Sequence, residues 1–289
     1  MGTEPQVHWG HAMSESKVVV PRPAATIVLV RDAPDGGGVE ALLFQRSPKA
    51  KFMPGAYVFP GGAVDADDMA PEIAAHVRGL DHAQANAKLG VAEGGLGYWV
   101  AAIRECFEEC GIVLSSDEGG DFVGLHDTEH EARLAQQRDA LNRGELAFSA
   151  FVQRERLRLA ADKLTYFAHW ITPVGMSRRY DTRFFLTVVP PRQTPQHDAN
   201  ELVAQVWLRP DEAVEQADAG KLDLRTPTRS TLHSFIGAKS ADDLVARMRN
   251  LREIRAILPV ITGEGVRLMP GDPGFGAQGR IDPSDGGAR

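Results

Sequence analysis

The stretch Gly97–Ile112, GYWVAAIRECFEECGI, has the spacing of a helix with two unlike faces. At about 100° per residue, its apolar side chains gather on one side, and Glu105, Glu108 and Glu109 gather on the other. Like charges at these spacings repel by roughly 0.2–0.5 kcal/mol per pair, and the helix dipole disfavours anions near the C-terminal end. A solvated surface face would accommodate such a cluster, and so would a face that binds a cation.

The residues around the three glutamates favour a bound cation. Arg104 lies next to Glu105 and four residues before Glu108, but one guanidinium does not neutralise three carboxylates. Mg²⁺ and Mn²⁺ prefer oxygen ligands and keep water in their remaining positions. Gly111 is placed to end the helix as a left-handed cap. The stretch therefore predicts a helix whose C-terminal end holds divalent metal.

These residues also carry a family resemblance. The run Arg104–Ile112, RECFEECGI, matches the R-E-U-x-E-E-x-G-U half of the Nudix box, where U is an apolar residue. Gly62 is similar to the glycine that opens the box, and Asp68 stands where the family usually has glutamate. The box is enlarged by about 28 residues between Gly62 and Arg104. The chain thus resembles Nudix hydrolases whose box carries an insertion.

A second motif lies upstream of the box. LLFQRS at 42–47, followed by Lys51, Gly55 and FPGG at 59–62, is similar to the signature of Nudix hydrolases that act on coenzyme A. Its spacing agrees throughout, with Phe44 in place of threonine and Lys51 in place of arginine. Together with the enlarged box, it resembles the subgroup of coenzyme A and acyl-coenzyme A diphosphatases.

The resemblance implies a metal-dependent enzyme that cleaves the diphosphate of coenzyme A or acyl-coenzyme A to 3′,5′-ADP and a phosphopantetheine. ADP-ribose or another nucleoside diphosphate derivative is the alternative substrate, because Phe44 and Lys51 depart from the signature. A nucleotide-sensing domain without catalysis is the alternative from another class. Such domains usually lose box carboxylates, and this chain retains Glu105, Glu108 and Glu109.

The same resemblance assigns roles to individual residues. Mg²⁺ or Mn²⁺ would be held by the three glutamates and by backbone carbonyls of the turn formed by Gly61 and Gly62. Arg104 would orient the carboxylates. Which carboxylate takes a proton from water stays open. A further acid outside the box often reaches the metal in this family, and Glu201 is the first candidate, with Asp198 second.

Basic residues outside the box are candidates for binding the substrate. Arg46 and Lys51 of the signature would contact the 3′-phosphate or the diphosphate of coenzyme A. The loop 173–183 carries further arginines, among them Arg179 and Arg183, which could clamp phosphates. A solvated basic loop is equally consistent with their spacing.

Composition narrows the class of protein. The chain has 289 residues, 43% hydrophobic residues and a formal net charge of −7, so neither nucleic acid nor an anionic membrane is an expected partner. The only cysteines, Cys106 and Cys110, are expected to be buried thiols in a reducing compartment. No apolar run reaches membrane-spanning length, and the last three residues are not a Ser-Lys-Leu signal. We expect a cytoplasmic protein, with a homodimer as one arrangement.

The pattern along the chain predicts an α/β sandwich of the Nudix type, with a mixed sheet between helical layers and added C-terminal helices. Residues 1–20 are expected to form an arm, 21–269 one domain with an insertion at about 65–96, and 270–289 a tail rich in glycine and proline. Strands are predicted at 24–30, 39–45, 57–59, 164–172, 183–189 and 201–208. Besides the helix at 97–112, helices are predicted at 71–89, 128–142, 149–159, 211–219, 226–236 and 241–251.

Overall fold

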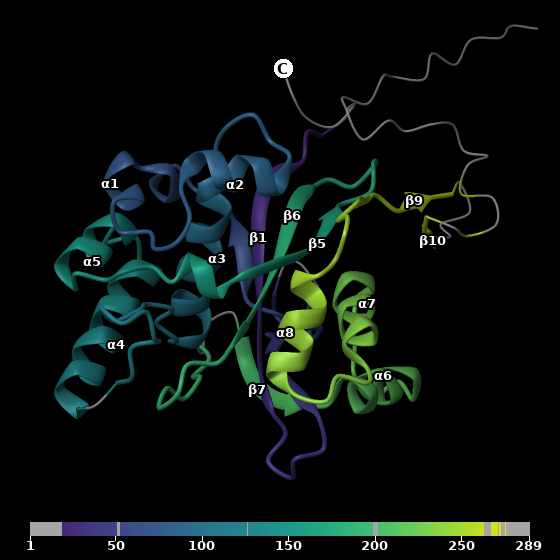
Figure 1. Cartoon of the computed structure of the whole chain (residues 1–289). Helices are drawn as coiled ribbons and strands as arrows, with labels where there is room; N and C mark the ends of the chain where they lie inside the picture. Colours follow the sequence, from purple (N-terminus) through teal and green to yellow (C-terminus); the bar gives the residue numbers. More distant parts are fainter. Residues whose placement is uncertain are drawn as a thin grey trace, which may run out of the picture.

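A computed structural model gives the arrangement of the chain (Figure 1). The structure describes residues 19–50, 53–125, 127–198, 202–262, 267–270, 272 and 275. The predicted arm and tail fall almost wholly outside these residues, so both stay predictions. Among the described helices, none is both long and apolar enough to cross a membrane.

The described strands form one mixed sheet and a separate small ribbon. The path through the sheet is β3-β2-β1-β6-β5-β8, with β4 paired to β1 and β7 paired to β2. The bounds are β1 Arg22–Asp32, β2 Val39–Arg46, β3 Tyr57–Val58, β4 Gly61–Ala63, β5 Thr165–Ile171, β6 Tyr180–Val188, β7 Leu202–Leu208 and β8 Ala256–Ile257. The ribbon pairs β9 (Val260–Ile261) with β10 (Arg267–Leu268).

Strand β1 organises the sheet. Its apolar residues are buried on both faces, as expected of a central strand. It pairs antiparallel with β2 and parallel with β6 over Arg22–Val30. On the flank opposite β6, ahead of its pairing with β2, β1 also pairs with β4, and Ala25 lies opposite Gly62. The glycine turn of the enlarged box is therefore fixed to the central strand.

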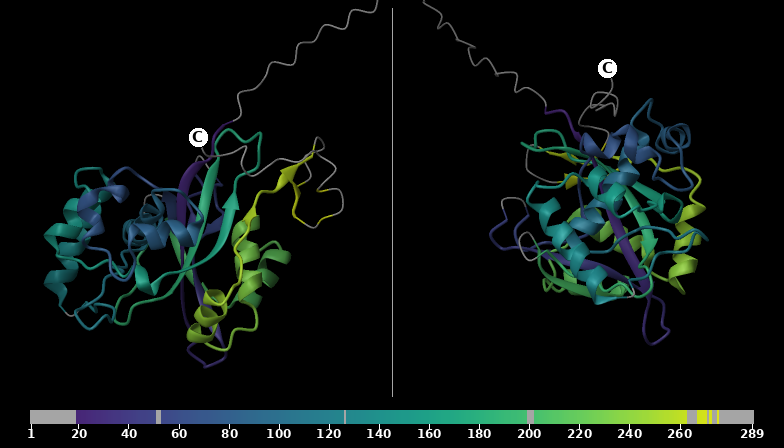
Figure 2. Two further views of the ribbon diagram at one scale, coloured as in Figure 1. Left: turned by 45° about the horizontal axis from the view of Figure 1, so that its top comes forward. Right: turned by 90° about the vertical axis from the view of Figure 1, so that its left-hand side faces the viewer.

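Helices cover both faces of this sheet and bury two separate cores (Figures 1 and 2). One face carries α1 Pro71–Ala74, α2 His82–Leu89, α3 Gly95–Cys110, α4 Thr128–Asn142 and α5 Phe148–Arg154. The other face carries α6 Pro210–Asp218, α7 Thr226–Phe235 and α8 Ala241–Arg249. The predicted α/β sandwich with C-terminal helices is confirmed.

Helix α3 lies against the first face, and its sequence explains how it begins and ends. Gly94 and Gly111 flank it in the left-handed conformation, with φ of 75° and 71°. The backbone N–H of Gly111 donates to the carbonyl of Phe107 and closes the last turn. Cys106 and Cys110 are buried free thiols, as predicted.

The insertion differs from its prediction. Residues 71–89 form two short helices, α1 and α2, in place of one helix. The chain turns at Gly79, where φ is 71°, and Asp81 then caps α2 through a capping box with Gln84. Ahead of the turn, Val77 forms a bridge with Leu159, so tertiary pairing replaces helix there.

Two further elements differ clearly in their bounds from the sequence-based prediction, and three short strands are additional. Helix α5 ends at Arg154, because Arg156 adopts a positive φ of 52°. Strand β6 begins at Tyr180, three residues early, since Asp181 and Thr182 already pair with both neighbouring strands. The short strands β8, β9 and β10 were not predicted, because each has only two residues.

Candidate active site

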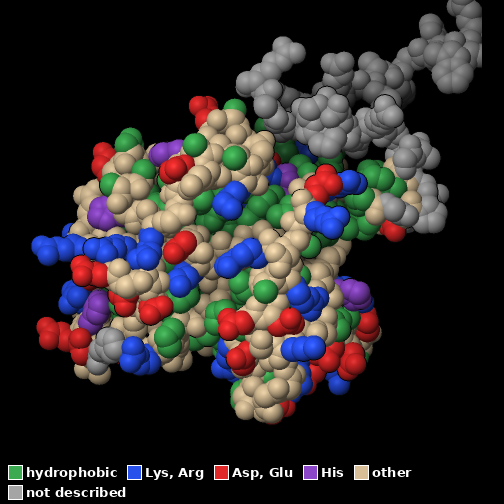
Figure 3. Space-filling model, in the orientation of Figure 1, with side chains coloured by type: hydrophobic (Ala, Val, Ile, Leu, Met, Phe, Trp, Pro, Cys, Tyr) green, Lys and Arg blue, Asp and Glu red, His purple; other side chains and the backbone are tan. Residues whose placement is uncertain are grey.

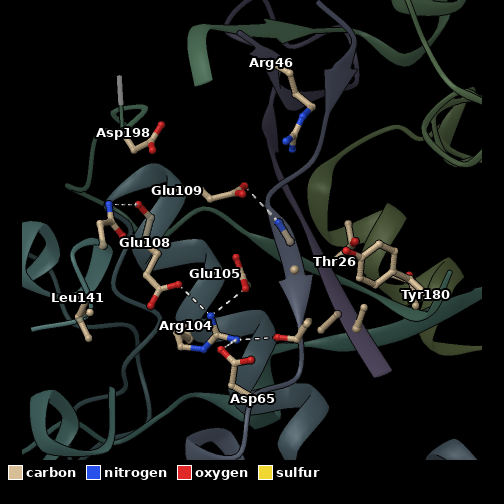
Figure 4. A pocket seen from close by; sticks show the side chains of 18 of the residues that line it. Thr26, Arg46, Asp65, Arg104, Glu105, Glu108, Glu109, Leu141, Tyr180 and Asp198 are labelled. Atoms are coloured by element: carbon tan, nitrogen blue, oxygen red, sulfur yellow. Dashed lines mark hydrogen bonds and ion pairs between the residues drawn. The ribbon is translucent and has the colours of Figure 1, made fainter. Parts of the chain in front are cut away.

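A cavity of about 740 Å³ opens where α3, β4 and the ends of β1 and β2 meet. Glu105, Glu108 and Glu109 line it from α3, and Gly61 and Gly62 line it from β4 (Figure 4). The prediction of a carboxylate face next to the diglycine turn is thus realised in one cavity. The helix end does not project into bulk solvent.

Arg104 lies among the acidic side chains of this cavity and joins them. Its Nη1 donates to Glu105 Oε1 and to Glu108 Oε2, each at 2.8 Å. Its Nε and Nη2 donate to the two carboxylate oxygens of Asp68 at 2.8 and 2.9 Å. A last bond runs from Nη2 to the carbonyl of Ala63 in β4. The guanidinium therefore fixes two glutamates relative to the insertion and the sheet.

The pair formed by Asp68 and Arg104 is almost fully buried. The side chain of Asp68 has 0% exposure and that of Arg104 has 7%. Burial raises the pKa of Asp68 and outweighs the hydrogen bonds from Arg104. For Arg104, burial acts to lower the pKa, but the hydrogen bond to Asp68 and the charge of Glu105 raise it overall. Arg104 is therefore charged at every physiological pH.

The diglycine turn approaches α3 closely. The backbone N–H of Gly61 donates to Glu109 Oε2 at 3.2 Å. A Cβ at Gly62 would lie 2.3 Å from Glu105 Oε1, well inside van der Waals contact. Glycine at position 62 thus follows from the position of the Glu105 carboxylate, and the turn and the helix form one unit.

The cavity holds more negative than positive charge. Its described lining includes five acidic residues (Asp65, Glu105, Glu108, Glu109, Asp198) and three arginines (Arg46, Arg104, Arg178). Burial, opposed by Arg104 and reinforced by Glu108, raises the pKa of Glu105 to about 7. Burial also raises the pKa of Glu108. In both carboxylates the cost of burial exceeds the stabilisation that the Arg104 charge gives to the ionised form.

The excess of acidic residues in the lining and the raised pKa values of Glu105 and Glu108 both fit a hard divalent cation. The acidic side chains offer carboxylate oxygens, the ligand type that Mg²⁺ and Mn²⁺ prefer. A cation would offset the charge that burial leaves uncompensated. In the described part of the chain, no three Asp, Glu, His or Cys side chains already converge tightly enough to enclose an ion. Arg104 donates to one oxygen of each of two carboxylates, Glu105 Oε1 and Glu108 Oε2.

The substrate-binding residues predicted from sequence are only partly brought to this cavity. Arg46 lines it, and Figure 4 shows its side chain pointing toward Glu109. Lys51 and Glu201 lie outside the described residues, so both assignments stay predictions. Asp198, the second candidate for the extra acid, does line the cavity.

Arg179 and Arg183 lie elsewhere. Both are buried, with 3% and 5% exposure. Arg179 donates to the carbonyls of Thr172 and Val19, and so ties the start of β6 to β1 and to the end of β5. Arg183 lies on the face of β6 toward α3, away from Tyr180 and Thr182, with its guanidinium 5.7 Å from the ring of Tyr98. The predicted phosphate clamp by these two arginines is therefore corrected, because strand alternation turns them away from the cavity.

The residues of this segment that do line the cavity are Arg178, Tyr180 and Thr182, in place of Arg179 and Arg183. The sequence analysis included Arg178 only as one of the arginines of the loop 173–183, and it did not select Tyr180 or Thr182. The alternation of β6 contains the signal, because Tyr180 and Thr182 share one face while Asp181 and Arg183 share the other. This alternation could identify Tyr180 and Thr182 as lining residues only after the strand is known to begin at Tyr180.

Comparison with known proteins identifies the family. The family described as the NUDT19 Nudix domain matches residues 78–232. The acyl-coenzyme A diphosphatase NUDT19 of Gallus gallus is 30% identical over 87% of this chain and 79% of its own length. The enzyme of the same name from Homo sapiens is 31% identical, over 83% and 73%.

A solved structure agrees with the sequence relatives. The Nudix hydrolase from Alicyclobacillus acidocaldarius superposes with a TM-score of 0.62 and 27% identity, over 81% of this chain and 97% of that one. The fold, the carboxylate helix at the cavity and these relatives lead to one conclusion. The chain belongs to the NUDT19 family of Nudix diphosphatases.

Proposed function

We propose that this protein hydrolyses the diphosphate of coenzyme A or acyl-coenzyme A to 3′,5′-ADP and the corresponding phosphopantetheine. The observation that carries the proposal is the position of Arg46. This arginine of the coenzyme A signature lines the same cavity as Glu105, Glu108 and Glu109. Relatives named acyl-coenzyme A diphosphatases support the same substrate class.

The residues on the acidic side account for metal dependence. Glu105, Glu108 and Glu109, with backbone of Gly61 and Gly62, would hold Mg²⁺ or Mn²⁺. A bound divalent ion lowers the pKa of a water ligand and offsets charge on phosphate oxygens, which together is worth several kcal/mol. Arg104 keeps the carboxylates in place through its bonds to Asp68 and Ala63.

The other basic residues of the lining account for binding a polyanion. Arg46 and Arg178 bring guanidinium groups to the cavity in addition to the Arg104 network. Guanidinium groups suit phosphate oxygens because they donate two parallel hydrogen bonds. Arg46 would bind the diphosphate or the 3′-phosphate. Asp198 lies within the same lining and is the described candidate for an additional acid.

The test is product analysis with purified protein and Mg²⁺ or Mn²⁺. Coenzyme A, decanoyl-coenzyme A, ADP-ribose, NADH and a dinucleoside polyphosphate are each incubated, and products are separated by chromatography. We expect 3′,5′-ADP from the coenzyme A species, at a higher kcat/KM than for the other substrates. Coenzyme A left intact under all conditions would remove this proposal, and faster cleavage of ADP-ribose would establish the rival substrate.

A pair of variants tests whether the carboxylate face performs the reaction. Glu108→Gln and Glu109→Gln should each lower kcat by at least about 100-fold, because each removes a charged metal ligand. Glu145→Gln is the matched control, since Glu145 is 58% exposed and pairs with Arg143 at the surface. Turnover that survives both active-site replacements would favour a nucleotide-sensing domain whose apparent activity has another source.

A further inference from the structure

A second cavity, of about 490 Å³, adjoins the first on the side of the C-terminal helices. Thr26, Gly61 and Tyr180 line both cavities, and so do Arg46 and Thr182. Figure 4 shows Thr26 and Tyr180 on the side of the first cavity away from Glu108 and Asp198. A molecule whose diphosphate lay beside α3 could therefore extend into the second cavity without leaving the protein surface.

The two cavities differ in chemistry. Among the described residues, no acidic side chain lines the second cavity, whereas five line the first. Apolar side chains make up much of its wall, and they come from separate parts of the chain: Met53, Pro54, Val58, Phe59, Trp170, Ile171, Pro173, Met176, Phe184, Pro227 and Pro259. Its volume falls within the roughly 300–1,000 Å³ typical of small-molecule sites. The cavity suits a ligand with a long apolar body.

Several polar groups of the second cavity already have partners within the protein or suit neutral ligand groups. Arg225 pairs with Asp223 at 2.6 Å, and Arg267 donates to Thr226 Oγ1 at 2.6 Å. The threonines at 172, 182 and 228 also line the wall, and their hydroxyls can both donate to and accept from amides. A pantetheine arm carries amides, and its thioester carries the apolar chain.

We propose that this second cavity binds the acyl-pantetheine arm of the substrate, while the 3′-phosphorylated nucleotide stays on the side of the first cavity. This inference rests on the proposed function. It predicts that the enzyme prefers acylated coenzyme A, and that the cavity bounded by α7 and the loop 173–179 sets the accepted chain length. Met53 and Met176 fit that role because unbranched, polarizable side chains adapt to ligands of different shape.

Met176 allows the cavity to be altered without disturbing the core, because it lies in a loop and is 36% exposed. Met176→Gln keeps the length of the side chain but replaces its apolar end. The ratio of kcat/KM for decanoyl-coenzyme A to that for coenzyme A should fall about fivefold, since part of the acyl chain would meet an amide without a partner. Met176→Trp should shift the preferred acyl chain to shorter lengths by filling the cavity.

Ile236→Gln is the matched control. Ile236 is 39% exposed at the end of α7 and does not line the cavity, so the ratio should stay as in the unaltered protein. Inhibition by 3′,5′-ADP is measured in parallel and should be equal in all variants. An unchanged ratio in both Met176 variants overturns the proposal. Weaker inhibition by 3′,5′-ADP in those variants also overturns it, because the nucleotide would then occupy this cavity.

Binding separates this proposal from the proposed function. Decanoyl-pantetheine lacks the diphosphate, and calorimetry measures its binding whether or not any coenzyme A species is cleaved. Should the protein cleave none of them, the proposed function fails. Weaker decanoyl-pantetheine binding in Met176→Gln than in Ile236→Gln would still support an acyl site, and no binding to the unaltered protein would overturn it.

Discussion

At position 62 a single methyl group would overlap a carboxylate. A Cβ added there would meet Glu105 Oε1 at 2.3 Å, and Arg104 holds that oxygen from the other side at 2.8 Å. Glu105 cannot yield to the methyl group without loosening its bond to Arg104. The requirement for glycine at position 62 therefore comes from a neighbouring side chain, since its own φ is not in the left-handed region.

Gly62→Ala should lower kcat/KM by roughly 10- to 100-fold, because displacing a reacting group by about 1 Å can cost that much. The loss in free energy of unfolding should be smaller than the loss in transition-state stabilisation, since the methyl group meets the movable end of the Glu105 side chain. Gly119→Ala is the control, where the added Cβ would meet Asp117 Oδ1 at an ordinary 3.4 Å. Steady-state kinetics and urea unfolding measure the two effects. Equal activity in both variants would contradict the proposed role of the turn.

At the scale of elements, the insertion is joined to α3 by one buried ion pair. Asp68 belongs to the short helix η1, Asp67–Met69, and holds Arg104 with two hydrogen bonds. The neighbouring Asp67 accepts from the backbone N–H and the hydroxyl of Ser149 in α5. Through these adjacent aspartates the insertion connects the carboxylate helix to the outer helical layer.

Asp68→Asn should destabilise the protein by about 3–5 kcal/mol, because it leaves Arg104 buried without its main counter-charge. Urea unfolding at pH 7 measures the change. Glu253→Gln, which alters an exposed pair with Arg255, should leave the free energy of unfolding nearly unchanged. Similar small effects in both variants would show that Glu105 and Glu108 suffice to balance the Arg104 charge.

A second polar pair joins strands β5 and β6 on the face toward α3. His169 Nε2 donates to Asp181 Oδ1 at 2.5 Å, and Arg183 Nη1 lies 3.5 Å from the same oxygen. Burial acts to raise the pKa of Asp181, but the His169 bond and the Arg183 charge outweigh it and lower that pKa below its usual value. A lowered folded-state pKa stabilises the fold above the unfolded value, and this stabilisation is lost as pH falls through the folded value.

Asp181→Asn should therefore be less stable than the unaltered protein at pH 7. The difference between the two should shrink as pH falls below about 4, where the unfolded aspartate takes up its proton. Urea unfolding of both proteins at several pH values between neutral and acid gives the measurement. A difference that stays constant over this range would show that Asp181 does not contribute through its charge.

At the scale of the whole molecule, the two helical layers serve different chemistry. The layer with α3 supplies the acidic side of the first cavity, and the start of α7 supplies part of the wall of the second. The two cavities meet where β1 pairs with β4, at Thr26 and Gly61. On the surface seen in Figure 3, acidic and basic side chains are interspersed, a pattern that does not favour binding of nucleic acid over that face.

Metal binding should be visible as a change in the stability of the whole protein. Mg²⁺ at about 100 times its Kd should raise the free energy of unfolding by about 2.7 kcal/mol, because the ion binds only the folded chain. The rise should vanish in the double variant Glu108→Gln/Glu109→Gln, measured by urea unfolding with EDTA or Mg²⁺ at equal ionic strength. An equal rise in the double variant would place the cation elsewhere on the protein.

The sequence by itself determined the family, the carboxylate helix and the diglycine turn, whereas the structure placed Arg46 in the same cavity as the acidic cluster. The first three features follow from local spacing, since a helix period fixes which glutamates share a face. Tertiary structure alone decided that Arg179 and Arg183 turn away from the cavity, that the insertion breaks at Gly79, and that a second cavity adjoins the first. The physical reason is that strand register, long-range pairing and cavities depend on residues far apart in the chain, which no local pattern records.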